Sequence, residues 1–360
     1  MQVNSTETTG GRVVYADVLR IFATFAVIIM HVSASVWNVE PVRSLSWQMC
    51  NVYESLVRWA VPVFVMISGV FLLNPDKELS AGKVYKKYVL RVVIAIAVWG
   101  LFYRCTDIAI SKFIRHKEIS RNAAIVELLE IPFGTAWFHL WYLYMIIGLY
   151  VMTPIYRVFT RTAGKKEACY LLAVFAIAGI CLPFVKKMLL GIHPRLNLNL
   201  SVVETMNYTG YFFAGYYLSK AHFSKRQMRL IFVAGILSVA ITAVGTSFVS
   251  IRAGKGVELF YENMSPVTMM EAVMVFVLVK SVWEERPLSQ RCTRIVTELS
   301  SCTFGIYLLH AFMIRLCDMA GLTTFMSPAI SIPLVSVIVF IASLIVVYLL
   351  RRIPVFRKIS

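Results

Sequence analysis

The chain is long, apolar and poor in charge. Its 360 residues are 59% hydrophobic and 15% charged, whereas soluble proteins are usually nearer half apolar and a quarter charged. This composition excludes an ordinary soluble domain and predicts an all-α polytopic membrane protein in a lipid bilayer. The net charge of +17 does not indicate a nucleic-acid partner, because the Lys and Arg residues separate apolar segments, as topology signals do.

Ten stretches have the roughly 17 to 25 largely apolar residues that a membrane-spanning helix needs. They are 13–37, 45–73, 84–105, 136–156, 168–184, 203–219, 228–250, 266–283, 302–320 and 328–350. Lys and Arg are about twice as frequent in the segments on the N-terminal side of the membrane as on the other side, which predicts cytoplasmic termini. We therefore expect one integral membrane domain over 1–360, with short tails at 1–12 and 351–360, and a short interfacial helix within 106–135.

The first stretch carries a polar stripe. Arg20 and His31 are eleven residues apart, so on an α-helix they differ by only about 20° in direction and lie about 16 Å apart along the axis. Helical spacing adds further polar residues to this face: Asp17, Thr24 and Ser35. Ionisable groups are costly inside a bilayer and usually line a cavity or a pathway.

Arg20 and His31 suit a transfer reaction. A neutral imidazole can take a proton from an attacking hydroxyl, and a guanidinium offers a planar fork of donors to a phosphate or an oxyanion. With Arg20 nearer the cytoplasm, the pair fits an anionic cytoplasmic donor that meets an acceptor at His31. Alternatively, Asp17 and Arg20 form an intrahelical ion pair, with Arg20 extended towards the membrane surface.

The second and fourth stretches hold further candidates. Arg58 follows Glu54 by four residues, so it either forms an ion pair inside the membrane or contacts the substrate. Pro62 and Ser68-Gly69 could open this helix locally and expose backbone groups to a ligand. His139 and Trp141 begin the fourth stretch, and Trp141 either belongs to an aromatic belt at the membrane surface or lines the entrance for the acceptor.

Later stretches add three candidate substrate residues. Tyr307 and His310 lie on one face of the ninth stretch, where His310 either packs or joins the active site. Glu204, in the sixth stretch, either lines the acceptor cavity or pairs with Arg58 or Arg104. The sequence contains no metal-binding pattern such as HExxH and no GxSxG elbow, so we expect no metal and direct transfer rather than a covalent intermediate.

Five motifs in order resemble the acyltransferase-3 family of bacterial integral membrane acyltransferases. They are Arg20-x10-His31, VPVFVMISGVFLL (61–73), FHLWYL (138–143), GYFFAGYYL (210–218) and SCTFGIYLLHAF (301–312). Val36-Trp37, and the run from Trp47 to Arg58, are similar to the branch that contains the O-acetyltransferase of enterobacterial common antigen.

The resemblance implies an O-acyltransferase of the bacterial inner (plasma) membrane. Its donor would be cytoplasmic acyl-CoA, most simply acetyl-CoA, and its acceptor a hydroxyl of an envelope glycan or a lipid-linked sugar. It also implies that His31 is the general base and that Arg20 binds the donor or stabilises the oxyanion. Ser68, in the Ser-Gly motif, would contact the donor.

The start of the third stretch departs from the family pattern. Where many members have an Arg-rich RxxR element, this chain has Lys86, Lys87 and Arg91. Positive charge is retained, but a Lys cannot bind a phosphate through two parallel hydrogen bonds. We expect these three residues to contribute to binding of the acyl-CoA.

A transporter or flippase of a lipid-linked sugar or acyl compound is the alternative, with the polar stripe as its pathway. Two repeats with interrupted helices would favour transport, and the sequence has no such symmetry. A purely structural subunit would not explain the aligned Arg20 and His31. The sequence indicates no oligomeric state.

Overall fold

A computed structural model describes residues 13–114, 116, 120–133, 136–192, 208–284, 288–354 and 356. Within these residues all regular secondary structure is helical, and nine helical segments are long and apolar enough to cross a membrane. The predicted all-α polytopic fold is thus confirmed. The predicted stretch 203–219 lies partly outside the described residues, and its described part forms the 12-residue helix α11 (Thr209–Lys220). The tail 1–12 is also outside them.

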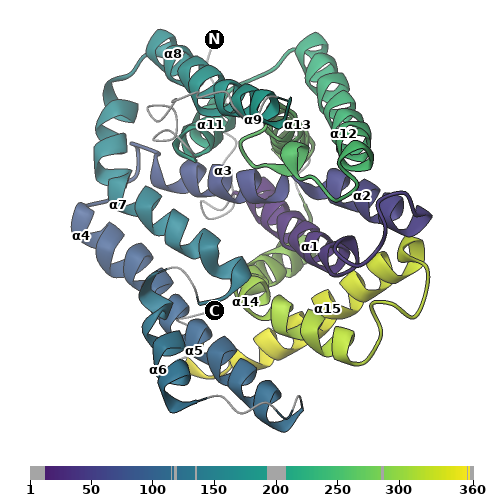
Figure 1. Cartoon of the computed structure of the whole chain (residues 1–360). Coiled ribbons are helices and arrows are strands. Elements are labelled where there is room, and N and C mark those ends of the chain that lie inside the picture. The colour runs from purple at the N-terminus through teal and green to yellow at the C-terminus, as the bar shows by residue number, and fades with distance from the viewer. Residues whose placement is uncertain are drawn as a thin grey trace.

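Helix α1 (Val14–Trp37) lies at the centre of the bundle (Figure 1). Five helices pack around it: α2 (Leu45–Val57), α3 (Ala60–Leu72), α13 (Pro266–Glu284), α14 (Gln290–Met319) and α15 (Pro328–Leu350). Three buried alanines, Ala16, Ala23 and Ala26, let these neighbours approach closely. This central position shelters the polar stripe of α1 from lipid.

The predicted second stretch, 45–73, is two helices rather than one. Helix α2 ends at Val57 and α3 begins at Ala60, with turn residues Arg58 and Trp59 between them. Pro62 explains the break, because it has no N–H to donate to the carbonyl of Arg58 and its ring crowds that carbonyl. The local opening expected at Pro62 is confirmed, and it places Arg58 at the junction of two half-helices. The opening expected at Ser68-Gly69 is wrong, because α3 is continuous through both residues.

Helices α3 and α11 pack with their backbones in close contact. A Cβ atom added to Gly69 would lie 1.8 Å from the carbonyl oxygen of Phe212, and one added to Gly215 would lie 1.9 Å from that of Met66. Only glycine fits at either position. Buried Arg157 donates hydrogen bonds to the carbonyls of Leu72 (2.9 Å) and Asn74 (2.7 Å), which caps the end of α3.

The remaining elements surround this centre (Figure 1). They are α4 (Ala81–Lys83), the π-helix η2 (Val84–Val89), α5 (Leu90–Phe113), α6 (Arg121–Leu129), the 3-10 helices η3 (Ile131–Phe133) and η4 (Phe138–Leu140), α7 (Trp141–Thr162), α8 (Lys165–Val174), the π-helix η5 (Phe175–Cys181), α9 (Leu182–Ile192), α12 (Lys225–Ala253) and the 3-10 helix η6 (Leu259–Tyr261). Helix α5 continues past the predicted end at 105 and ends at Phe113. Helix α6 is the short helix expected in 106–135.

Candidate active site

At the N-terminal end of the polar stripe of α1, neighbouring residues hold Arg20 in place. Its Nη1 donates a hydrogen bond to Oδ1 of Asp17 (2.8 Å), and the hydroxyl of Ser300 on α14 donates to the same oxygen (2.7 Å). Asp17 is buried, and the hydroxyl of Thr24 donates to the Arg20 carbonyl (2.8 Å). The predicted Asp17–Arg20 ion pair is confirmed, and it holds the guanidinium at the edge of a cavity.

That cavity, which we call the arginine cavity, has a volume of about 390 Å³. Its polar lining comes from Arg20, Ser68, Tyr88, Arg91, Tyr142, Tyr150, Ser300, Ser301, Thr303 and Tyr307. Three of the predicted donor-binding residues, Arg20, Ser68 and Arg91, therefore come together from α1, α3 and α5. Lys86 and Lys87 lie on η2, are exposed to solvent or lipid, and are not part of the lining.

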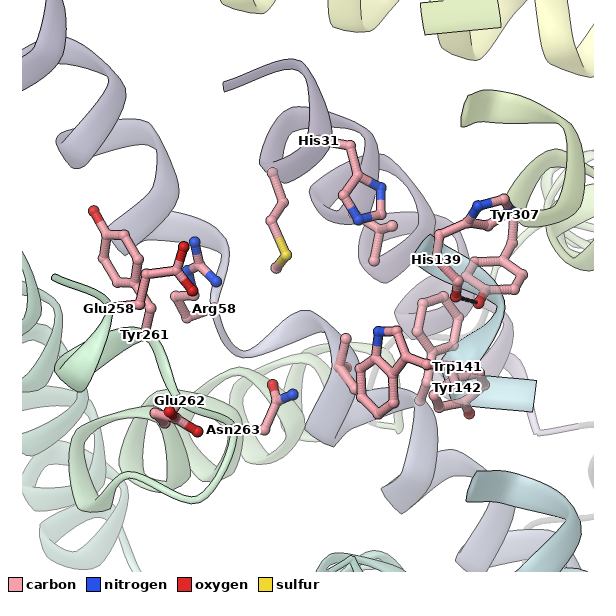
Figure 2. Close-up of a pocket in the computed structure, with 14 residues that line it drawn as sticks. His31, Arg58, His139, Trp141, Tyr142, Glu258, Tyr261, Glu262, Asn263 and Tyr307 are labelled. Atoms are coloured by element: carbon pink, nitrogen blue, oxygen red, sulfur yellow. Dashed lines mark hydrogen bonds between the residues drawn. The ribbon is translucent and has the colours of Figure 1, made fainter. Parts of the chain in front are cut away.

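A second cavity of about 270 Å³ surrounds His31, and we call it the histidine cavity (Figure 2). It is lined by Val27, Met30, His31, Arg58, Val61, Phe64, His139, Trp141, Tyr142, Glu258, Tyr261, Glu262, Asn263 and Tyr307. The predicted substrate residues Arg58, His139, Trp141 and Tyr307 are all in this set. The set draws on α1, α3, α7, α14 and the connections beside them.

His31 is held by a second histidine. Nδ1 of His31 lies 2.7 Å from Nε2 of His310, and Nδ1 of His310 lies 2.5 Å from the carbonyl oxygen of Tyr307. A carbonyl only accepts, so Nδ1 of His310 carries its proton and its Nε2 accepts one from Nδ1 of His31. When both imidazole rings are neutral, this chain of hydrogen bonds leaves Nε2 of His31 as the nitrogen that can accept a proton.

His139 is a third imidazole of the cluster. Its ring centre lies 5.1 Å from that of His310 and 6.5 Å from that of His31. The side chain is 1% exposed, and neither ring nitrogen has a hydrogen-bond partner among the described residues. A buried polar group left without a partner costs about 1–3 kcal/mol. A polar group of a bound ligand would remove that cost.

Arg58 is both paired and directed to the cavity. It forms the expected ion pair with Glu54, one turn earlier on α2, and its guanidinium lies 3.9 Å from the ring centre of Tyr261. Figure 2 shows Arg58, Glu258 and Tyr261 together on the side of the cavity opposite His139 and Tyr307. The two alternatives for Arg58, an ion pair and a substrate contact, are therefore compatible.

Helix α1 thus presents an arginine to one cavity and a histidine to the adjoining one. A comparison of the whole sequence with known families identifies what kind of protein has this arrangement. A family model described as an acyltransferase domain matches residues 13–352. The chain belongs to the acyltransferase-3 family. No curated protein and no solved structure matches it. The family match does not distinguish branches, so the likeness to the common-antigen branch stays a prediction.

One segment of this membrane acyltransferase was missed in the sequence. The connection between α12 and α13 contributes Glu258, Tyr261, Glu262 and Asn263 to the histidine cavity. It belongs to no motif and to no polar stripe, and the only signal was a cluster of Glu, Tyr and Asn between two apolar stretches. Glu204, predicted as a substrate residue, lies outside the described residues.

The two residues predicted to act together, Arg20 and His31, lie in different cavities of the acyltransferase. Arg20 lines only the arginine cavity and His31 only the histidine cavity. His310 lines neither but holds His31, and Asp17 lines neither but holds Arg20. Across the part of the chain that the structure describes, no group of three or more His, Cys, Asp or Glu side chains is placed to hold a metal ion.

Proposed function

We propose that the protein transfers an acyl group, in the simplest case acetyl, from acyl-CoA to a hydroxyl of a carbohydrate or lipid-linked sugar. The observation that carries the proposal is the hydrogen-bond chain from the Tyr307 carbonyl through His310 to His31. It leaves the basic nitrogen of His31 beside a polar cavity, within a family of acyltransferases. That is the position a general base for an attacking hydroxyl requires.

The arginine cavity suits the donor. Two guanidinium groups, Arg20 and Arg91, and several hydroxyls line it, and this chemistry binds phosphate groups. Of the two roles predicted for Arg20, donor binding fits better, because Arg20 lies about 16 Å from His31 along α1. Lys86 and Lys87 precede Arg91 in the sequence and are exposed, so they can meet the phosphate-rich end of a bound acyl-CoA.

The histidine cavity suits a sugar acceptor. Glu258, Glu262 and Asn263 supply hydrogen-bond acceptors and a donor, while Trp141, Tyr142 and Tyr261 supply flat apolar faces. A small number of polar groups among aromatic walls is usual for a site that orients a small ligand. Of the charged lining residues, Arg58 is paired with Glu54 and Glu262 with Lys187, which leaves the Glu258 carboxylate to favour a neutral, hydroxyl-rich acceptor over an anionic one.

The proposed reaction is a direct transfer. The acceptor hydroxyl donates to Nε2 of His31, which takes the proton as the oxygen attacks the thioester carbonyl. The tetrahedral intermediate places negative charge on the former carbonyl oxygen, and His139, whose neutral ring carries one N–H, can donate to it. The C–S bond then breaks, and the proton on His31 passes to the departing CoA sulfur.

Labelled acetyl transfer tests this assignment. Purified protein in lipid discs would be incubated with labelled acetyl-CoA and a panel of envelope glycans, and donor binding would be measured separately. We expect His31→Ala to lower transfer by about 10²- to 10⁴-fold with donor binding retained, and Arg20→Ala to weaken donor binding. Full transfer by His31→Ala would overturn the general-base assignment. Vesicle flux of a lipid-linked sugar without acetyl-CoA binding would instead favour the transporter.

A further inference from the structure

Three aromatic residues form a wall between the two cavities. Phe64 of α3, Tyr142 of α7 and Tyr307 of α14 are the residues that appear in both linings. Their ring centres are 6.2 Å apart for Phe64 and Tyr142, and 5.8 Å apart for Tyr142 and Tyr307. These spacings are those of packed aromatic pairs, so the three rings form a continuous partition.

We propose that this aromatic wall is the acyl-chain selector of the enzyme, and that Phe64 and Tyr142 set the longest acyl group it transfers. The inference rests on the proposed function, in which the donor occupies the arginine cavity and the acceptor hydroxyl meets His31. The thioester and the hydroxyl then lie on opposite sides of the wall. One of them has to pass between the rings before the bond can form.

The acyl end of the donor, rather than the sugar acceptor, is the part that passes between the rings. A sugar carries hydroxyls that would lose their hydrogen bonds between aromatic rings, and such a loss is costly. An acetyl thioester presents one methyl group and one carbonyl. Each further methylene would have to fit on the histidine side, where a cavity of about 270 Å³ also holds the acceptor. Longer acyl groups are therefore excluded by volume.

Tyr307 and Phe64 differ in how firmly they are held. The hydroxyl of Tyr307 donates to the carbonyl of His139 (Figure 2), and the Tyr307 carbonyl accepts from His310. Moving Tyr307 would disturb the support of His31. Phe64 has no polar side-chain atom, is only partly buried, and lies one turn beyond the break at Arg58 and Trp59. Phe64 can therefore rotate or be shortened at the cost of packing alone.

The test is donor preference in Phe64→Ala. We would measure kcat/KM for acetyl-, propionyl- and butyryl-CoA with one acceptor in wild type, Phe64→Ala, Tyr142→Leu and Tyr142→Phe. A hydrophobic pocket discriminates one methylene by about 10- to 200-fold, so we expect the butyryl-to-acetyl ratio to rise at least about tenfold in Phe64→Ala. Tyr142→Leu should raise it too, whereas Tyr142→Phe, which keeps the ring, should not.

Phe340→Ala is the matched control. Phe340 on α15 packs edge-to-face against Phe25 with ring centres 5.6 Å apart and lines neither cavity. It loses the same side-chain volume as Phe64→Ala, but because Phe340 lines neither cavity it should leave the donor ratio unchanged. If Phe64→Ala does not fold, Phe64→Leu should shift the ratio in the same direction by less.

Two results would overturn the proposal that the wall selects the acyl chain, and a third would overturn the proposed function on which it rests. An unchanged ratio in a folded Phe64→Ala protein, or an equal shift in Phe340→Ala, would show that the wall does not select, while wild-type acetyl transfer still upheld the proposed function. Absence of acetyl transfer by the wild type would overturn the proposed function itself, and the selector with it.

Discussion

The arginine cavity and the histidine cavity are built on the same helix but are supported in different ways. The Arg20 guanidinium is paired with Asp17, three residues away on the same helix. His31 is held by His310, which is 279 residues away in the sequence. The difference teaches that a charged anchor can be positioned within one helix, whereas a base needs a distant partner to fix its proton.

The reason is chemical. A guanidinium is always protonated and offers donors in several directions, so a nearby carboxylate is enough to orient it. An imidazole can place its single proton on either nitrogen, and only a hydrogen bond to one of them decides which nitrogen is basic. If this comparison is right, changes at the histidine support should affect catalysis, and changes at the arginine support should affect donor binding.

Among the variants that test this comparison, the largest effect is expected from His310→Phe. This change removes the acceptor for Nδ1–H of His31, so either ring nitrogen of His31 can then carry the proton. We expect kcat to fall by about 10- to 100-fold, the range seen when groups that orient metal-ligating histidines are removed, while KM for acyl-CoA stays within about twofold. Steady-state kinetics at saturating acceptor would measure both.

His310→Gln is the control for that variant. A glutamine side chain can accept through its oxygen and donate through its nitrogen, so it should recover part of the lost kcat. A glutamine variant as inactive as the phenylalanine variant, with both proteins folded, would contradict the orienting role.

Arg20→Lys should have the next largest effect. The charge remains, but the planar fork that binds a phosphate through two hydrogen bonds is lost. We expect KM for acyl-CoA to rise about tenfold, because a charged hydrogen bond contributes about 1.5 kcal/mol or more, with kcat at saturating donor changed less. A normal KM with a low kcat would place Arg20 in the chemistry and remove the contrast between the cavities.

Asp17→Asn tests the support of Arg20 rather than Arg20 itself. The amide oxygen of Asn can still accept from Arg20 and from Ser300, but the negative charge beside the guanidinium is gone. We expect KM for acyl-CoA to rise by about threefold, since an amide is a weaker partner than a carboxylate. Ser300→Ala, which removes one neutral hydrogen bond to Asp17, should raise it less, and an order in which Ser300→Ala is worse would contradict this support.

Lys87→Arg should have the smallest effect. Lys87 is exposed on η2 and is not part of the arginine cavity, so restoring an arginine there should change KM for acyl-CoA by less than about threefold, within the range of exposed ion pairs. The same donor titration measures it. A tenfold lower KM would show that Lys87 reaches the donor directly.

The sequence allowed several parts of the site to be predicted. Arg20 and His31 were recognisable because an eleven-residue spacing returns to one face of a helix, and Pro62 because proline interrupts the hydrogen bonds of any helix. Arg58, His139, Trp141 and Tyr307 were predicted as substrate residues because polar and aromatic groups in apolar stretches are rare. All four line the histidine cavity. Lys86 and Lys87 share the charge of Arg91 in sequence, but only Arg91 lines the arginine cavity.

The sequence by itself determined the all-α membrane fold and the polar stripe of α1, because hydropathy and helical period are local properties that hold wherever a helix packs. Only the tertiary structure decided that His310 supports His31, that the 258–263 connection lines the histidine cavity, and that Phe64, Tyr142 and Tyr307 separate the cavities. These features depend on which helix faces lie against one another. In a bilayer that choice rests on side-chain packing and close backbone contacts, such as those of Gly69 and Gly215, because lipid is as apolar as the helices themselves.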